Sequence, residues 1–146
     1  MRIAKLKHWK DADAGWLRDM DTICFPAPDP SFNNGPSYHW WVAYDGDRPV
    51  AYAGLYVQTK GLEAHFERCG VLPSARGQGL QRALIKARLV WCRRKGMLVA
   101  KTYTSGPQHA DGANAYSIAN LRDCGFQSRV VSGGKWVRFA LALKGA

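Results

Sequence analysis

The sequence contains no long apolar run, and no stretch approaches the roughly 20 uninterrupted apolar residues that a membrane-spanning helix requires. The first residues, MRIAKLKH, also lack the apolar core of a signal peptide. We therefore expect a cytoplasmic protein with no membrane partner.

Paired cysteines are also missing. The four cysteines are scattered along the chain and form no CxxC motif: Cys24, Cys69, Cys92 and Cys124. Their spacing indicates neither a zinc site nor a redox pair, so we expect buried, reduced thiols and no metal.

Acidic residues are absent from the middle of the chain. Residues 68–110 contain nine Lys and Arg residues but no Asp or Glu, and they carry nearly all of the formal net charge of +10. Such an excess is typical of a protein with a polyanionic partner, such as nucleic acid, an anionic surface or a phosphate-rich ligand.

The length of 146 residues and the apolar fraction of 47% favour a single domain spanning residues 1–146. The hydrophobic pattern predicts strands at 2–6, 39–44, 49–58, 63–72, 97–104, 126–131 and 135–143, helices at 11–23, 80–95 and 114–124, and a proline-rich loop at 25–37. This order predicts an α/β fold of the α+β type, with a central mixed, mostly antiparallel sheet flanked by helices.

The helix that begins at residue 80 has the most regular pattern. Its apolar residues recur at i, i+3, i+4, i+7, i+10 and i+11, namely Leu80, Ala83, Leu84, Ala87, Val90 and Trp91. This spacing predicts one face turned toward the core.

A glycine-rich turn, Arg76-Gly77-Gln78-Gly79, joins a strand directly to that helix. A helix N-terminus carries unpaired N–H groups and the positive end of the helix dipole, and glycines let a phosphate approach the backbone. The turn could hold a diphosphate, although two glycines alone are more often only a tight connection. The glycine spacing matches neither the P-loop nor the dinucleotide fingerprint.

Two longer motifs add to this turn. Residues 71–84, VLPSARGQGLQRAL, closely resemble the acetyl-CoA motif V-x-P-x-x-R-G-x-G-x-[GA] of the GNAT superfamily of N-acyltransferases. Residues 114–126 resemble the N-x-x-[SA] to G-F segment that follows the next strand in that superfamily. The resemblance implies a GNAT-like acyl-CoA N-acyltransferase fold. It also implies that an acetyl (acyl) group passes from acetyl-CoA to a primary amine by direct attack in a ternary complex, without an acyl-enzyme.

The resemblance further implies where acetyl-CoA, the co-substrate, would bind. Backbone from Gln78 to Gln81 would hold the pyrophosphate, and the strand at Cys69 to Val71 would pair with pantetheine. Arg76 would shape the turn or contact phosphate. The full set of expected cofactor-binding residues is Cys69, Gly70, Val71, Arg76, Gly77, Gln78, Gly79, Leu80, Gln81, Arg82, Asn114 and Ser117.

The sequence departs from the family pattern at two positions. Gln81 stands where Gly or Ala is usual, at the first turn of the phosphate-binding helix. Leu121 stands where many members have the tyrosine that protonates the leaving thiolate. That acid role therefore cannot be carried over to this chain.

A catalytic base is expected near the thioester, because an alkylamine with a pKa near 10 is only about one part in a thousand neutral at pH 7. By strict alternation His65, Glu67 and Cys69 share one face of the strand before the glycine turn. Glu67 is the first candidate for the base and His65 is the second. The alternatives are a solvated carboxylate and a histidine that pairs with a neighbour.

Tyr103 and Tyr116 are the nearest tyrosines that could protonate the thiolate, and core packing is the alternative for each. A thiol with a pKa of about 8.5 is already a fair leaving group at neutral pH. We therefore expect the thiolate to leave without help from a protein acid.

The amine acceptor, a small molecule or a peptide or protein amine, is expected to lie against the N-terminal half, which carries most of the acids. The candidate contacts there are Asp13, Asp19, Asp21, Asp29, Phe32, Tyr38, Trp40 and Trp41. An acidic half beside a basic cofactor half would suit a cationic amine.

Two rival functions stay open. Arg82, Lys86 and Arg93 fall on one helical face and could contact a nucleic-acid backbone, but no recognised DNA-binding or RNA-binding motif accompanies them. A GNAT domain that binds acyl-CoA without catalysis is the second rival. A homodimer is also left open.

Overall fold

The computed structural model describes residues 1–6, 11–25, 36–105, 113–131 and 136–143, without the side chains of 11–14, 59, 105, 113–115 and 130. In these residues seven strands form one sheet in the order β1-β2-β3-β4-β5-β7-β6. The strands are β1 (Arg2–Lys5), β2 (Tyr38–Asp45), β3 (Arg48–Gln58), β4 (Glu63–Val71), β5 (Val99–Ser105), β6 (Gln127–Val131) and β7 (Trp136–Ala142). Neighbouring strands are antiparallel except β4 and β5, which confirms the predicted mixed sheet.

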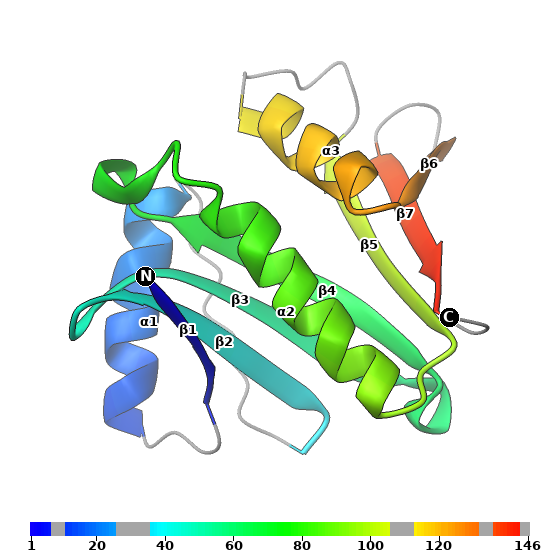
Figure 1. Ribbon diagram of the computed structural model, residues 1–146, viewed down its shortest axis with the longest axis horizontal. Coiled ribbons are helices and arrows are strands. Elements are labelled where there is room, and N and C mark those ends of the chain that lie inside the picture. Colours follow the sequence, from blue (N-terminus) through cyan, green and yellow to red (C-terminus); the bar gives the residue numbers. More distant parts are fainter. Residues whose placement is uncertain (7–10, 26–35, 106–112, 132–135, 144–146) are drawn as a thin grey trace.

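Three helices cover this sheet in the described residues: α1 (Asp11–Cys24), α2 (Leu80–Arg94) and α3 (Ala113–Asp123). Two short 3-10 turns, η1 (Thr59–Gly61) and η2 (Pro73–Ala75), flank β4. α2 crosses the sheet beside α3, and α1 packs near the β1 to β3 end (Figure 1). None of the described helices is long and apolar enough to cross a membrane.

Each face of the sheet has its own core. On the α2 side Leu84, Ile85 and Leu89 pack with sheet residues such as Phe66 and Phe139. On the opposite side the α1 residues Leu17 and Met20 pack with Trp40, Val42 and Tyr52. α2 and α3 therefore cover one face of the sheet and α1 covers part of the other.

The predicted element order is confirmed, but the predicted inner face of α2 is partly wrong. Val90 is 47% exposed, and the buried residues of the helix are Leu80, Leu84, Ile85, Arg88, Leu89 and Cys92. The buried stripe therefore includes Arg88, a charged residue, and leaves Val90 outside it. Most of the predicted proline-rich loop, residues 26–35, lies outside the described residues.

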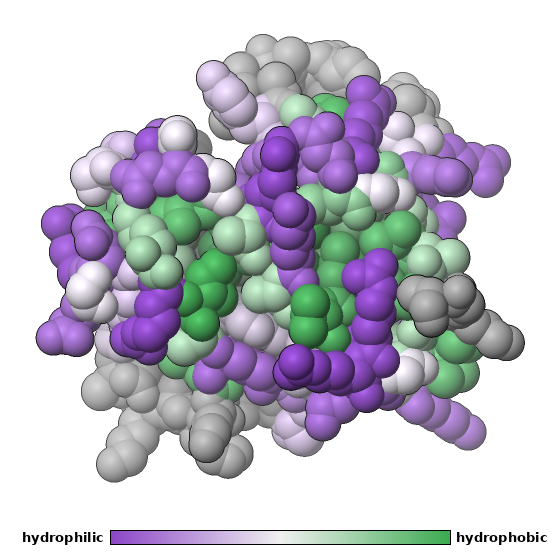
Figure 2. All heavy atoms as spheres, viewed as in Figure 1, coloured by the Kyte–Doolittle hydropathy of each residue, from purple (hydrophilic) through white to green (hydrophobic). Residues whose placement is uncertain are grey.

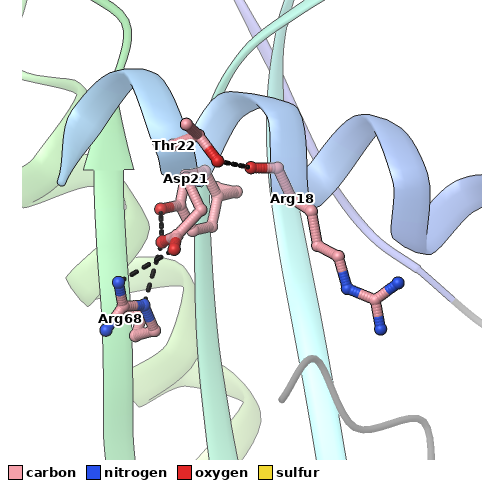
Figure 3. A network of polar contacts seen from close by, with 5 residues as sticks. Arg18, Asp21, Thr22 and Arg68 are labelled. Carbon is pink, nitrogen blue, oxygen red and sulfur yellow. Dashed lines mark hydrogen bonds and ion pairs between the residues drawn. The ribbon is translucent and has the colours of Figure 1, made fainter. Parts of the chain in front are cut away.

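A buried carboxylate joins α1 to the sheet. Asp21 is 1% exposed and accepts two hydrogen bonds from Arg68, with Nε to Oδ1 at 2.9 Å and Nη2 to Oδ2 at 2.8 Å (Figure 3). The Tyr52 hydroxyl donates a third hydrogen bond to Asp21. Charge-assisted bonds of this kind offset the cost of burying the carboxylate, so the group fixes α1 against β3 and β4.

A cluster of rings and cations joins β2 to the C-terminal end of α2. The His39 ring lies 4.4 Å from the Trp91 ring, and the Nζ atoms of Lys5 and Lys95 lie 5.5 and 5.9 Å from the Trp91 centroid. Burial, followed by the charges of the two lysines, lowers the pKa of His39 to about 4. His39 is therefore neutral in the folded protein at neutral pH.

We expect acid to destabilise the protein through His39. The unfolded chain binds a proton at His39 with a pKa of about 6.5, whereas the folded chain binds it only near pH 4. The contribution of neutral His39 to the free energy of unfolding is fully present above about pH 6.5 and is lost as the pH falls toward about 4. In urea unfolding, His39→Phe should lose less free energy of unfolding over this range than the parent protein. Parallel pH curves for the two proteins would contradict this assignment.

Candidate functional site

α2 begins directly after the glycine-rich turn. Gly77 has φ 80° and Gly79 has φ 75°, a left-handed backbone that strains residues with a side chain. Gly79 occupies the N-cap position without a capping side chain, and the first helical hydrogen bond runs from Ala83 N to Gly79 O at 3.0 Å. The N–H groups at the start of α2 therefore have no intrahelical acceptor.

The Arg76 side chain holds the turn in place. Its Nε donates to the carbonyl oxygen of Val71 at 3.1 Å, across the short turn η2. This hydrogen bond ties the start of the glycine-rich turn to the end of β4.

The unusual Gln81 connects α2 to α3. Its Nε2 donates to Ser117 Oγ at 2.9 Å, and Asn120 Nδ2 donates to Gln81 Oε1 at 2.7 Å. Arg82 forms an ion pair with Asp123 nearby. Gln81 thus spans the two helices, and the side chains of Ser117 and Arg82 are engaged in the same junction. The side chain of Asn114 lies outside the described part of the chain.

β4 and β5 separate beside this helix end (Figure 1). Their parallel pairing covers only three residue pairs, from Glu63↔Val99 to His65↔Lys101. One further bond, from Thr102 Oγ1 to the carbonyl oxygen of Phe66 at 2.9 Å, bridges the widening gap. In the described residues, the β4 edge at Cys69 to Val71 has no strand beside it on that side. The molecular outline is notched between η2 and α3, at the start of α2 (Figure 2).

A β-bulge interrupts β4 next to the gap. Gly54 pairs with Glu67, but the preceding β3 residue, Ala53, pairs with Cys69, so Arg68 is the extra residue. Glu67 and His65 therefore lie on the α1 side of the sheet, while Cys69 lies on the α2 side and packs against the core. The expectation that all three share one face is wrong, because the bulge breaks the alternation. Burial raises the pKa of the Cys69 thiol.

Gly70 is a glycine for a packing reason. A Cβ at this position would lie 2.5 Å from Cε1 of the Tyr52 ring. Tyr52 in turn contacts Asp21, so the expected pantetheine edge rests on the same buried group that anchors α1.

Arg88 is a site residue that the sequence analysis missed. It is 2% exposed, and its Nη1 donates to the carbonyl oxygens of Gly54 at 3.0 Å and Glu67 at 3.4 Å. Its Cζ lies 4.3 Å from the centroid of the Phe66 ring. Arg88 therefore supplies donors to the two carbonyls at the bulge. Its spacing was a usable signal, because it follows Leu80 and Leu84 at i+8 and i+4 in the apolar stripe.

His65 is held among aromatic rings. It stacks on Tyr56 with ring centroids 4.7 Å apart, and its ring centroid lies 5.7 Å from that of Tyr103. Burial, followed by the charge of Lys101, lowers the pKa of His65 and keeps it neutral at pH 7. Lys101 itself pairs with Glu63 at 2.9 Å.

The two tyrosine candidates are surface residues. Tyr103 is 43% exposed and Tyr116 is 76% exposed, so core packing is the wrong explanation for either one. Leu121 is 6% exposed and belongs to the α2-side core. The position that often holds the family tyrosine is therefore filled by a packed apolar side chain.

The chain matches the family model described as the Acetyltransferase (GNAT) family over residues 5–126. The chain belongs to the GNAT acetyltransferase family. Among curated proteins, none matches it.

Solved GNAT structures share the fold at low sequence identity. The ribosomal-protein-S18-alanine N-acetyltransferase from Escherichia coli is 18% identical with a TM-score of 0.79, covering 99% of this chain and 96% of that one. An aminoglycoside 6'-N-acetyltransferase complexed with coenzyme A is 14% identical with a TM-score of 0.79, covering 100% and 99%. The spermidine/spermine N-acetyltransferase from Vibrio cholerae is 14% identical with a TM-score of 0.70, covering 97% and 95%.

The expected acceptor contacts of this GNAT chain need correction. Asp21 is buried with Arg68 and Tyr52, and Trp40 and Trp41 are each 4% exposed in the two cores. Asp19 is exposed, whereas the Asp13 side chain and residues 29 and 32 lie outside the described part. The folded N-terminal half therefore offers fewer free acids than its composition suggested, because Asp21 is used to anchor α1.

In the described part of the GNAT chain, no group of three or more His, Cys, Asp or Glu side chains could hold a metal ion. The four cysteines are free thiols; Cys92 is buried as predicted, whereas Cys24, Cys69 and Cys124 are only partly buried.

Proposed function

We propose that this GNAT protein transfers an acetyl group from acetyl-CoA to a primary amine by direct attack in a ternary complex. The observation that carries the proposal is the open N-terminus of α2 beside the unpaired edge of β4. The first feature suits a diphosphate and the second suits an extended amide chain, and CoA contains both in sequence. One structural relative is described as complexed with coenzyme A.

In this proposal the backbone from Gln78 to Gln81 binds the pyrophosphate. Gly77 and Gly79 give this segment the left-handed backbone that the turn requires. The β4 edge at Cys69 to Val71 pairs with pantetheine, and Asn114 bonds its far end. Arg76 keeps the turn in shape through its hydrogen bond to the carbonyl oxygen of Val71. Gln81, Arg82 and Ser117 support the helix end through the α2–α3 junction.

The thioester would then lie near the β4 bulge, where Glu67 points to the face opposite α2. Glu67 removes a proton from the ammonium, and the neutral amine nitrogen attacks the thioester carbonyl. The nitrogen then loses its second proton to solvent, and the carbon–sulfur bond breaks to release the amide and the CoA thiolate. Backbone N–H groups and solvent stabilise the thiolate, so neither Tyr103 nor Tyr116 is needed as an acid. His65 is the second candidate for the base.

The same proposal assigns the chain to the cytoplasm as one domain without a nucleic-acid partner. Arg82, the first cation of the basic α2 stripe, pairs with Asp123, which lowers the charge offered to a phosphate backbone.

We expect Gly79→Glu to weaken acetyl-CoA binding about 100-fold or more, because a carboxylate would replace the phosphate at the helix N-terminus. Gly79→Asn is the matched control, since Asn tolerates positive φ and adds no charge. Calorimetry with acetyl-CoA measures binding, and thiol release against a panel of primary amines measures transfer. Undiminished binding by Gly79→Glu would remove the site from this turn. Tight binding without thiol release for any amine would favour the non-catalytic acyl-CoA-binding domain.

A further inference from the structure

Four rings form a continuous line across the sheet on the face opposite α2. This aromatic row consists of Tyr38 on β2, Tyr56 on β3, His65 on β4 and Tyr103 on β5. Successive ring centroids are 5.6, 4.7 and 5.7 Å apart, and the last two pairs stack at 15° and 25°. Strand register aligns the first three, with Tyr38 opposite Tyr56 and Tyr56 opposite His65.

The row lies at the surface. Tyr103 is 43% exposed and the other three rings are half-buried, whereas Trp40 and Tyr52 on the same face are buried under α1. Stacked rings that no described helix covers present flat apolar area to a ligand.

The two central rings of the row, Tyr56 and His65, are uncharged at neutral pH. Burial and the charge of Lys101 lower the pKa of His65, and burial, followed by the charge of Glu67, raises the pKa of the Tyr56 phenol. Neutral aromatic rings stack on flat ligands, and their faces attract a positive charge. A charged histidine in the row would instead repel an ammonium group.

The described charges around the row are not those of a polycation site. Glu63 is paired with Lys101, and Asp21 is buried with Arg68. Beyond Tyr103, strand register places Arg138 and then Arg129 on the same face. A polyamine or aminoglycoside would meet these cations, whereas an amine with one positive charge can lie along β4, with its ring at His65 and its ammonium at Glu67.

We propose that the acceptor is an arylalkylamine: a primary amine with one positive charge on a short chain attached to a flat aromatic ring. Its ring lies on the aromatic row, and its ammonium group lies at Glu67, two residues beyond His65 on the same face of β4. This assignment rests on the proposed acetyl transfer and makes Tyr103 a specificity-determining residue.

The test compares 2-phenylethylamine with 2-cyclohexylethylamine, which have the same chain and charge but differ in the flatness of the ring. Spermidine is the third substrate. We expect the parent protein to favour the phenyl compound in kcat/KM about tenfold over the cyclohexyl compound, and more strongly over spermidine.

Tyr103→Leu should remove this preference, mainly through a higher KM for 2-phenylethylamine, and Tyr103→Phe, which keeps the ring, should retain it. Because Tyr103 is exposed, both variants should fold, and unchanged acetyl-CoA binding checks this. Equal kcat/KM for the two ring compounds, a preference for spermidine, or an equal loss for both compounds in Tyr103→Leu would each overturn the arylalkylamine assignment while acetyl transfer stands. A large kcat loss in Tyr103→Phe would instead identify an acid and overturn the specificity role. Absence of thiol release with every amine would overturn the proposed function itself, and the acceptor assignment with it.

Discussion

Arg88→Met is expected to lower the free energy of unfolding by about 2 kcal/mol and kcat/KM by about 100-fold. The buried guanidinium donates to the carbonyl oxygens of Gly54 and Glu67, and methionine would leave both without this donor. Each stranded carbonyl costs about 1–3 kcal/mol, partly offset by removing a buried charge. The larger effect on catalysis follows because a shift of about 1 Å in a reacting group can cost about 100-fold.

Arg88→Lys separates hydrogen-bond geometry from charge. The planar guanidinium of Arg88 makes two kinds of contact at once: Nη1 donates to the bulge carbonyls, and Nε donates to Leu84 O at 3.2 Å. A lysine keeps the positive charge, but its single ammonium cannot make both. We expect it to be at least as destabilised as Arg88→Met in urea unfolding. Lysine behaving like arginine would mean that charge is what matters. A methionine variant as stable as the parent protein would mean that the carbonyls find other donors.

The features that the sequence predicted correctly depend on local patterns. The turn at 76–79 and the helix after it could be found because left-handed glycines and helical spacing are properties of a few consecutive residues. The succession of strands and helices along the chain followed from alternation and from turn residues in the same way, whereas the order of the strands within the sheet was not predicted. The α2 N-terminus, which is the core of the candidate site, was therefore placed from the sequence alone.

The features that were missed depend on contacts between distant residues. The bulge shifts the register against β3 between Ala53 and Gly54, and the extra residue, Arg68, is neither a glycine nor a proline. Arg68 is instead drawn toward Asp21, 47 residues earlier. Arg88 was missed for a related reason, because the acceptors of its Nη1, the carbonyl oxygens of Gly54 and Glu67, lie at the bulge.

The bulge also decides which candidate can act as the base. It leaves Glu67 on the face of the aromatic row and moves Cys69 to the opposite face. His65 is neutral and stacked between two tyrosines, so it can accept a proton but its position is fixed by the row. Glu67 therefore stays the first candidate for removing the ammonium proton.

Glu67→Gln is expected to lower kcat/KM by about 100-fold at pH 7, within the range typical of general base catalysis. Glutamine keeps the size of the side chain but cannot take up a proton, so the variant depends on the small fraction of amine that is already neutral. That fraction rises about tenfold per pH unit up to the amine pKa near 10, so the deficit should shrink steadily as the pH rises. An amine with a pKa near 8 is the matched control. A larger fraction of this amine is already neutral at pH 7, so Glu67→Gln should lower its kcat/KM less. A constant ratio of parent to variant across the pH range, measured by thiol release with acetyl-CoA saturating, would contradict the base role and leave Glu67 as a residue that only positions the acceptor.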